Sequence, residues 1–375
     1  MGQAISQLTI KGFKSIRCLE NFELRDLNIL IGPNGAGKSN FIQFFELLRA
    51  VAKGQFQLYV GREGGADRVL FLGLKMTTEL SGSIAAGAPA MCWDFKTFAS
   101  KTNDLLFYEE NVRGGQRGLH SKWAKQLDRG LSESTLFSKR SDIETEEYIR
   151  NIKETIQPLM ESWVAYHFHD TSDFAAVKRP CTIRDYEYLR PDGSNLAAFL
   201  LFLKKKHEKQ YQRIRETIQL AAPFFDEFRL LEEEFKDDKQ VLLEWRQKGS
   251  DYHFLPSQIS DGTLRFICLA TALLQPSPPS TILLDEPELG LHPNALGLLA
   301  EMIQAASLKT QVIVATQSAS LISRFRPEDI VVVERKNEES VFRRLPLEKL
   351  KEWIGDYSLG ELWEMNLLEG RPENE

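Results

Sequence analysis

Residues 27–51 read LNILIGPNGAGKSNFIQFFELLRAV, which joins an apolar run, a glycine-rich loop and an amphipathic stretch in direct succession. Within this segment Gly32 is followed by four residues and then by Gly37, Lys38 and Ser39, which is the Walker A spacing. The motif requires a strand before it and a helix after it, and the sequence predicts both. Glycines let the backbone wrap a phosphate chain in conformations that a Cβ would resist. The segment therefore predicts a phosphate-binding loop.

This loop offers three kinds of contact to a nucleotide. Backbone N–H groups of residues 34–39 would point at a phosphate from the positive end of the new helix. Lys38 would neutralise the β- and γ-oxygens as a catalytic group, and the Ser39 hydroxyl would bind Mg²⁺. The alternative, an incidental Lys-Ser pair in a glycine-rich turn, is disfavoured because strand, spacing and helix agree. The expected nucleotide-binding residues of the loop are Asn34, Gly35, Ala36, Gly37, Lys38, Ser39 and Asn40.

Residues 281–293, TILLDEPELGLHP, place two acids directly after a dense apolar run. The run Ile282 to Leu284 is too apolar for an edge strand and predicts a central parallel strand buried on both faces. Asp285 and Glu286 then fall at its carboxyl end, where α/β proteins bind ligands. We expect Asp285 to hold Mg²⁺ through water and Glu286 to polarise an attacking water as general base. The alternative is that these acids only cap the next helix.

A second buried strand is predicted in residues 311–318, QVIVATQS. Gln317 lies just past the end of this strand, where it would reach the γ-phosphate or the attacking water. An ordinary polar residue at a strand end is the alternative for Gln317.

The polar stretch SQISDGTLRF, residues 257–266, comes about twenty residues before the acidic pair. Ser260 is a favourable N-cap for the apolar helix that begins here. Gly262 exposes a backbone N–H at the N-terminus of the same helix, which favours an anion. The two roles are compatible, because a capped helix can still present its N-terminus to another molecule.

The order of these motifs resembles that of ABC-type ATPases, and within them the soluble RecF/SMC/OLD-like branch. The resemblance implies the ABC head fold, hydrolysis of ATP with Mg²⁺, and head-to-tail pairing of two heads around two nucleotides. The stretches that carry it are IKGFKSI (10–16), GPNGAGKSN (32–40), QISDGTLRF (258–266), LLDEPELGLHP (283–293) and ATQSASLI (315–322).

By this resemblance Ser260, Asp261 and Gly262 match the signature motif, which caps the γ-phosphate held by the partner's Walker A loop. Asp261 departs from the two glycines of transporter-type signatures. The loop around Gly290, Leu291 and His292 matches the segment that crosses the dimer interface, where His292 is expected to pack and not to bind a metal.

Three further positions follow from the same resemblance. Gln317 occupies the family's switch position, which is usually His, and a neutral Gln stabilises developing charge less than His⁺ could. Lys14 and Ser15 lie where the family's N-terminal strand turn approaches the nucleotide. The glutamine loop of the family has no clear match in the middle of the chain.

Composition sets bounds on the class of protein. The chain has 375 residues, 42% hydrophobic and 27% charged, with a net charge of −6, so the whole molecule is not a polycation drawn to nucleic acid. Cys18, Cys92, Cys181 and Cys268 are widely spaced and fit free thiols in a reducing compartment. No stretch resembles a signal peptide or a membrane span. We expect a cytoplasmic protein without a membrane partner.

The fold class expected is α/β: a P-loop ABC ATPase head with a mixed central sheet, an antiparallel β lobe and a helical insertion. Three segments are expected. Residues 1–118 would form the N-terminal lobe, with short strands in 65–73, 79–87 and 93–99. Residues 119–240 would form a mainly helical insertion or lid. Residues 241–375 would form the C-terminal lobe, with 330–336 as the last strand of the core sheet.

The lengths of the middle and C-terminal segments argue against two kinds of family member, those with a long coiled-coil arm and those with a fused nuclease domain. About 220 residues between Walker A and the signature are too few for a long coiled-coil arm. After residue 336 only about forty residues remain, so we expect no fused nuclease domain of the TOPRIM type.

Two clusters in the middle are ambiguous. A dense basic stretch could bind nucleic-acid backbone, although a solvated helix face paired to glutamates is the favoured interpretation. His167 and His169 alternate without further ligands, so a metal site there is disfavoured. The basic residues are Lys204, Lys205, Lys206, Lys209, Arg213 and Arg215.

The sequence therefore predicts an ATP hydrolase that forms a homodimer through composite ATP sites, with higher oligomers allowed. Stand-alone heads of this branch often occur beside an effector, so the resemblance implies a separately encoded nuclease or toxin as partner in bacterial anti-phage defence. The alternatives are an ATP-gated scaffold that hardly hydrolyses and a RecF-like DNA-repair head. A transporter motor fits poorly because SDGT replaces the usual signature.

Overall fold

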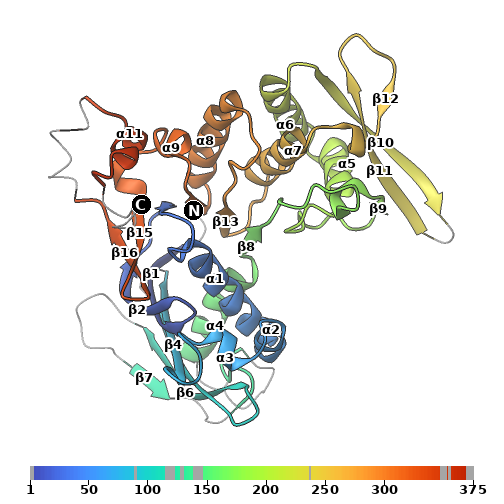
Figure 1. The fold of residues 1–375 in the computed structure, drawn as a ribbon. Coiled ribbons are helices and arrows are strands. Elements are labelled where there is room, and N and C mark those ends of the chain that lie inside the picture. The colour runs from blue at the N-terminus through green and yellow to red at the C-terminus, as the bar shows by residue number, and fades with distance from the viewer. Residues whose placement is uncertain are drawn as a thin grey trace.

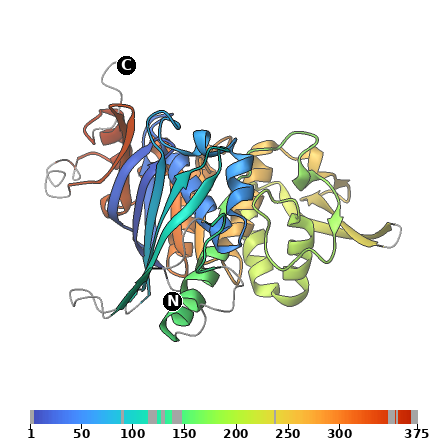
Figure 2. The same ribbon diagram turned by 90° about the horizontal axis from the view of Figure 1, so that it is seen from below.

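The computed structural model describes residues 4–87, 91–114, 123–126, 131–137, 147–235, 238–346, 353 and 356–368. Three β-sheets organise these residues (Figures 1 and 2). One end of the molecule holds an antiparallel sheet, and the other holds a long hairpin with two helices. The central sheet lies between them.

The central sheet is mixed, with parallel strands and one antiparallel edge strand. Its strands read LNILI, QVIVAT and TILLD at the centre, where nearly every residue is buried. Such continuous apolar runs are typical of strands covered on both faces. In spatial order the strands are β16 (Glu339–Arg344), β15 (Ile330–Lys336), β3 (Leu27–Ile31), β14 (Gln311–Thr316), β13 (Thr281–Asp285) and β8 (Val164–Tyr166).

Alternate residues of each central strand enter two different cores. Ile29 and Ile31 of β3 pack with the core that contains α7 (Asp261–Leu274) and α8 (Pro293–Ser307). Leu30 points to the opposite face, where it joins the core around α1 (Lys38–Ala52). This split follows from the two-residue period of a strand.

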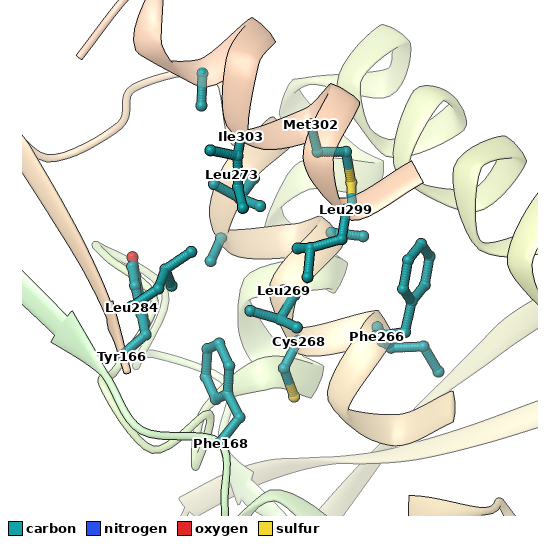
Figure 3. Packing of buried hydrophobic residues seen from close by; sticks show 14 of the residues in the cluster. Tyr166, Phe168, Phe266, Cys268, Leu269, Leu273, Leu284, Leu299, Met302 and Ile303 are labelled. Carbon is teal, nitrogen blue, oxygen red and sulfur yellow. The ribbon is translucent and has the colours of Figure 1, made fainter. Parts of the chain in front are cut away.

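Helices α7 and α8 cover one face of the sheet. Figure 3 shows Leu269 and Leu273 of α7 beside Leu299 and Ile303 of α8, with Leu284 of β13 close to them. All five side chains are buried in one cluster. This packing fixes the position of the α7 N-terminus relative to the end of β13.

The antiparallel sheet covers α1 from the other side. Phe44 of α1 contacts its strand β4, since a Cβ on Gly82 would lie 2.9 Å from the Phe44 ring. Its strands in order are β2 (Ile16–Glu23), β1 (Ile5–Phe13), β4 (Glu79–Ala86), β5 (Met91–Ala99), β6 (Leu105–Gly114) and β7 (Trp123–Gln126). The remaining helices of this half are α2 (Phe56–Arg62), α3 (Ala66–Val69) and α4 (Glu147–Glu161).

One strand expected in this half is wrong. Residues 65–73 contain the short helix α3 and turns instead of a strand. The N-terminus of α3 is held by Asn103, whose carbonyl oxygen accepts from Ala66 N at 2.8 Å and whose side chain accepts from Asp67 N at 2.9 Å. A contact from the β5–β6 connection therefore overrides the local apolar pattern.

The third sheet projects at the opposite end with α5 (Leu196–Lys206) and α6 (Glu208–Ala221). Two long strands, β10 (Phe225–Phe235) and β11 (Asp238–Gln247), form its hairpin. Strand β11 also pairs with β12 (His253–Phe254). Strand β9 (Cys181–Thr182) pairs with the same β11.

The division at residues 118 and 240 stays a prediction. Within the described part of 119–240, helices α4, α5 and α6 occur together with strands, and one of these, β8, belongs to the central sheet. The expectation that 330–336 is the last strand is wrong, because β16 follows β15. The C-terminal lobe also contains α9 (Ala319–Ile322) and α11 (Leu359–Glu364). Within the described ranges, no helix combines the length and apolarity that crossing a bilayer requires.

Candidate functional site

The glycine-rich loop joins β3 to α1 as its spacing predicts. Gly35 and Gly37 have φ values of 77° and 109°, a region that favours glycine. Gly37 is the N-cap residue of α1, so the free N–H groups of the first helical turn begin at Lys38. Asn34, Gly35 and Ser39 are exposed at the surface. The loop therefore presents backbone donors and a hydroxyl to solvent.

Two buried serines pack behind the loop. A Cβ on Gly37 would lie 2.0 Å from Ser340 Oγ and 2.7 Å from Ser15 Oγ. Ser15 and Ser340 share a hydrogen bond of 2.6 Å, and Ser340 Oγ donates to the carbonyl oxygen of Ala36 at 2.6 Å. Asn40 Nδ2 donates to Ser15 Oγ at 2.7 Å. Ser15 thus supports the loop from the side away from solvent, and Ser340 is a residue that sequence reasoning missed.

Lys14 also lies beside α1, where its side chain contacts Gln43 and not the glycine-rich loop. Its Nζ donates to Gln43 Oε1 and to Glu63 Oε2, each at 2.6 Å. Lys14 has a φ of 48°, as the turn between β1 and β2 requires. A contact between Lys14 and a nucleotide remains a prediction.

Lys38 is folded back onto its own loop. Its Nζ donates to the carbonyl oxygens of Gly32 at 2.7 Å and Pro33 at 3.0 Å. Burial lowers the pKa of Lys38, and the carboxylates of Glu286 and Asp285 oppose that effect. The ammonium group is therefore held in the loop close to the acidic pair, where a phosphate could replace the two carbonyl oxygens.

The acidic pair lies at the carboxyl end of β13 as expected. Asp285 is the last residue of the strand, and its Oδ1 is buried without a hydrogen-bond partner in the described part of the chain. Glu286 has a φ of 44°, and its N–H donates to Ala315 O at 2.8 Å. A non-glycine residue with positive φ is uncommon, so the turn after β13 holds Glu286 in an unusual backbone conformation.

Gln317 directly follows β14, the strand beside β13. Its N–H donates to Glu288 Oε1 at 3.2 Å, and Thr316 Oγ1 donates to the same oxygen at 2.5 Å. Burial raises the pKa of Glu288, and these hydrogen bonds oppose it. Sequence reasoning assigned no role to Glu288, because its importance depends on a neighbouring strand.

His167 directly follows β8, the strand that pairs with β13 on the side away from β14. In the β8–β13 register Tyr166 pairs with Leu284, so His167 follows at the level of Asp285. His167 Nε2 lies 3.2 Å from Glu46 Oε1 on α1. That hydrogen bond raises the pKa of His167, burial opposes it, and the charge of Asp285 adds to it. No local pattern gives His167 a role, because its position depends on the pairing of β8 with β13.

Four consecutive strands thus bring their ends to one edge. Gly32 follows β3, Gln317 follows β14, Glu286 follows β13 and His167 follows β8. Carboxyl ends of parallel strands form the ligand-binding edge of α/β sheets. The Walker A loop, the acidic pair and Gln317 are therefore together, as their sequence motifs predict.

The SDGT segment forms the N-terminus of α7. Ser260 caps α7 by accepting from Thr263 N at 3.3 Å, and both Ser260 and Asp261 are exposed. Asp261 Oδ1 lies 3.7 Å from Lys178 Nζ. Across the described ranges, no hydrogen bond or ion pair connects residues 260–262 with residues 32–40. The helix N-terminus is free to face another molecule.

Residues 288–292 pack against the beginning of α7. A Cβ on Gly262 would lie 2.2 Å from Gly290 O, and Arg265 Nη1 donates to Leu289 O at 3.0 Å. His292 is the N-cap of α8, where its Nδ1 accepts from Asn294 N at 3.3 Å. Within the described residues no group of three metal-ligating side chains occurs.

The basic stretch is partly paired. Lys205 forms an ion pair with Glu232 of β10 at 2.5 Å, and Lys204 Nζ lies 5.5 Å from the centre of the Tyr211 ring. Lys206 and Lys209 are exposed. These contacts suit a solvated helix face, and binding of nucleic acid there remains an alternative.

The site fits a nucleotide with a divalent cation. The buried, unpartnered Asp285 Oδ1 and the exposed Ser39 hydroxyl are oxygen donors of the kind that Mg²⁺ prefers. The Lys38 ammonium group binds two backbone oxygen atoms of its own loop, and phosphate oxygens are acceptors of the kind that it could bind instead.

A family model described as "AAA domain, putative AbiEii toxin, Type IV TA system" matches residues 27–323. No curated protein matches the chain. Among solved structures, an SmcHead bound to the C-winged helix domain of ScpA is 16% identical, with 93% of this chain and 99% of that chain covered and a TM-score of 0.60.

A second structure is the Smc head domain derived from Pyrococcus furiosus, with an extended coiled coil and bound to the C-terminal domain of ScpA. It is 15% identical, with 94% of this chain and 99% of that chain covered and a TM-score of 0.56. These likenesses confirm the P-loop α/β head fold. Because the family model covers most of the chain, the protein belongs to this AAA-domain family, and its fold is that of SMC head domains.

Proposed function

We propose that the chain binds ATP with Mg²⁺ and hydrolyses it as a head-to-tail homodimer. The supporting observation is that β3, β14 and β13 bring the Walker A loop, Gln317 and the pair Asp285–Glu286 to one sheet edge. The exposed residues Ser260 and Asp261 at the α7 N-terminus make no hydrogen bond or ion pair with the Walker A loop of their own chain, within the described residues. A second copy would supply Ser260 and the N–H of Gly262 to complete the nucleotide site.

Each side chain has a distinct task in this proposal. The N–H groups of residues 34–39 and the Lys38 ammonium bind the phosphates, while Ser39 and Asp285 hold the cation. Bound Mg²⁺ would neutralise charge on the phosphate oxygens. Glu286 accepts a proton from the attacking water as general base. Gln317 orients that water or the γ-phosphate through its amide.

The homodimer follows from the location of the SDGT segment. Ser260 and Asp261 are exposed at the N-terminus of a 14-residue helix, which attracts anions. Their own Walker A loop is not in polar contact with them. The γ-phosphate bound to a partner's loop is an anion that head-to-tail pairing would bring to Ser260 and to the N–H of Gly262.

We further propose that closure of the dimer controls a separate effector, a toxin or nuclease, in anti-phage defence. The family description names a toxin of a type IV TA system. Two SMC heads of the same fold are described as bound to parts of ScpA. Both descriptions support a head that acts together with a second protein.

Phosphate release from ATP with Mg²⁺ tests the enzymatic part. We expect turnover in the natural chain and its loss in Glu286→Gln, which keeps the side-chain shape but not the base. Glu301→Gln, an exposed change on α8, is the matched control and should leave turnover unchanged. Lys38→Ala should weaken ATP binding itself. Nucleotide binding without Glu286-dependent turnover would instead favour an ATP-gated scaffold.

A further inference from the structure

Glu288 is a half-buried acid that none of the expected roles uses. It lies in the turn between β13 and α8, two residues after Glu286. Its Oε1 accepts from Thr316 Oγ1 at 2.5 Å and from Gln317 N at 3.2 Å. Its Oε2 is buried and has no hydrogen-bond partner in the described structure. A carboxylate in such surroundings needs its remaining hydrogen bonds.

We propose that Glu288 is a positioning residue that fixes Gln317 for hydrolysis, an inference that rests on the proposed function. Its carboxylate accepts from the N–H of Gln317 itself. Thr316 Oγ1, held by the same oxygen, accepts in turn from Ser318 N at 3.1 Å. One carboxylate oxygen therefore fixes three consecutive residues around the switch position. Without it, the Gln317 N–H would lose the acceptor that the structure gives it, and the hydrogen bond from Glu286 N to Ala315 O would remain two residues earlier.

The same turn also contacts the signature helix. Leu289 O accepts from Arg265 Nη1 at 3.0 Å, and Gly290 O would lie 2.2 Å from a Cβ on Gly262. Residues 288–290 therefore lie between the α7 N-terminus and Gln317. A movement of α7 when Ser260 binds the partner's nucleotide would reach Gln317 through Glu288.

Two variants separate positioning from a general structural role. Glu288→Gln keeps a carbonyl oxygen that can accept both hydrogen bonds but removes the charge. Glu288→Met keeps nearly the same length and cannot accept them. A positioning role predicts that kcat falls roughly 10- to 100-fold in Glu288→Met while KM for ATP changes by less than about twofold. Glu288→Gln should retain most of kcat.

Amide hydrogen exchange gives a readout that does not depend on turnover. The N–H of Gln317 should exchange roughly tenfold faster in Glu288→Met than in the natural chain or in Glu288→Gln. Melting temperatures of both variants are measured in parallel, because a merely structural residue would lower stability without lowering kcat at temperatures where the protein is folded.

The outcomes separate this inference from the proposed function. Absence of Glu286-dependent turnover in the natural chain would refute the proposed function, and the exchange rates would still decide whether Glu288 anchors Gln317. Glu286-dependent turnover that Glu288→Met leaves unchanged would overturn the positioning role alone. Equal loss of turnover in Glu288→Met and Glu288→Gln would also overturn it, because charge and not hydrogen-bond acceptance would then matter.

Discussion

Replacing Ser260 by alanine separates its two roles. In the monomer, Ser260 Oγ caps α7 by accepting from Thr263 N at 3.3 Å. Loss of an N-cap serine costs about 1 kcal/mol of stability. In the proposed dimer the same hydroxyl also donates to the partner's γ-phosphate. Since the cap is lost in monomer and dimer alike, only this second bond changes the dimerisation constant.

The size of the effect on dimerisation follows from the symmetry of the pair. A hydrogen bond to a charged group contributes about 1.5–3 kcal/mol, and each dimer would contain two of them. Ser260→Ala should therefore weaken ATP-dependent dimerisation by about 3–6 kcal/mol, or roughly 10²- to 10⁴-fold. The assay is sedimentation analysis across protein concentrations with ATP and Mg²⁺, in the Glu286→Gln background so that ATP is not consumed.

Ser358→Ala is the matched control. Ser358 caps α11 by accepting from Glu361 N at 3.3 Å, the same cap bond at the same distance. Its Oγ also bonds the side chain of Glu361 at 2.8 Å, as Ser260 Oγ bonds the hydroxyl of Thr263 at 2.8 Å. Both variants should lose similar stability in thermal melting, but only Ser260→Ala should lose dimer affinity. A dimerisation constant within about threefold of the parent in Ser260→Ala would refute the contact in trans and leave Ser260 as a helix cap.

Two other predictions concern the loop and its neighbour His167. In Gly32→Ala the new Cβ would lie 2.2 Å from the backbone oxygen of Val333, so stability should fall by about 3 kcal/mol. Gly35→Ala has no atom within 4 Å of its Cβ, and only its φ of 77° disfavours alanine, by about 1 kcal/mol. It should therefore melt between Gly32→Ala and the parent, and equal melting temperatures of the two variants would contradict the packing. Because Glu46 raises the pKa of His167, the stability from this pair should be complete below the ordinary histidine pKa of about 6.5 and be lost as pH rises through the raised value. NMR titration should show the His167 pKa falling in Glu46→Gln, and an unchanged titration would refute the pairing.

Much of the site could be predicted because its motifs are local. The change from an apolar run to glycines correctly located the β3 end at Ile31, and the expected helix is present, although α1 begins at Lys38, three residues before the amphipathic stretch at Phe41. The run before Asp285 likewise predicted a strand buried on both faces. In each case the chemistry depends on residues a few positions apart.

The missed features depend on contacts between distant segments. Ser340 meets Ser15 across 325 positions of sequence, and β16 was missed because its pattern is half-exposed. His167 acquires a role only when Val164 pairs with Ile282. The helix at 66–69 depends on Asn103. No local pattern contains this information.

The size of the Glu286→Gln protein with and without ATP and Mg²⁺ tests the central claim most directly. We expect a monomer in the absence of nucleotide and a stable dimer once ATP is added. Glu301→Gln should remain mainly monomeric as ATP is consumed. A Glu286→Gln protein of the same size in both conditions, whether monomer or dimer, would contradict the claim that two copies enclose the nucleotide between them.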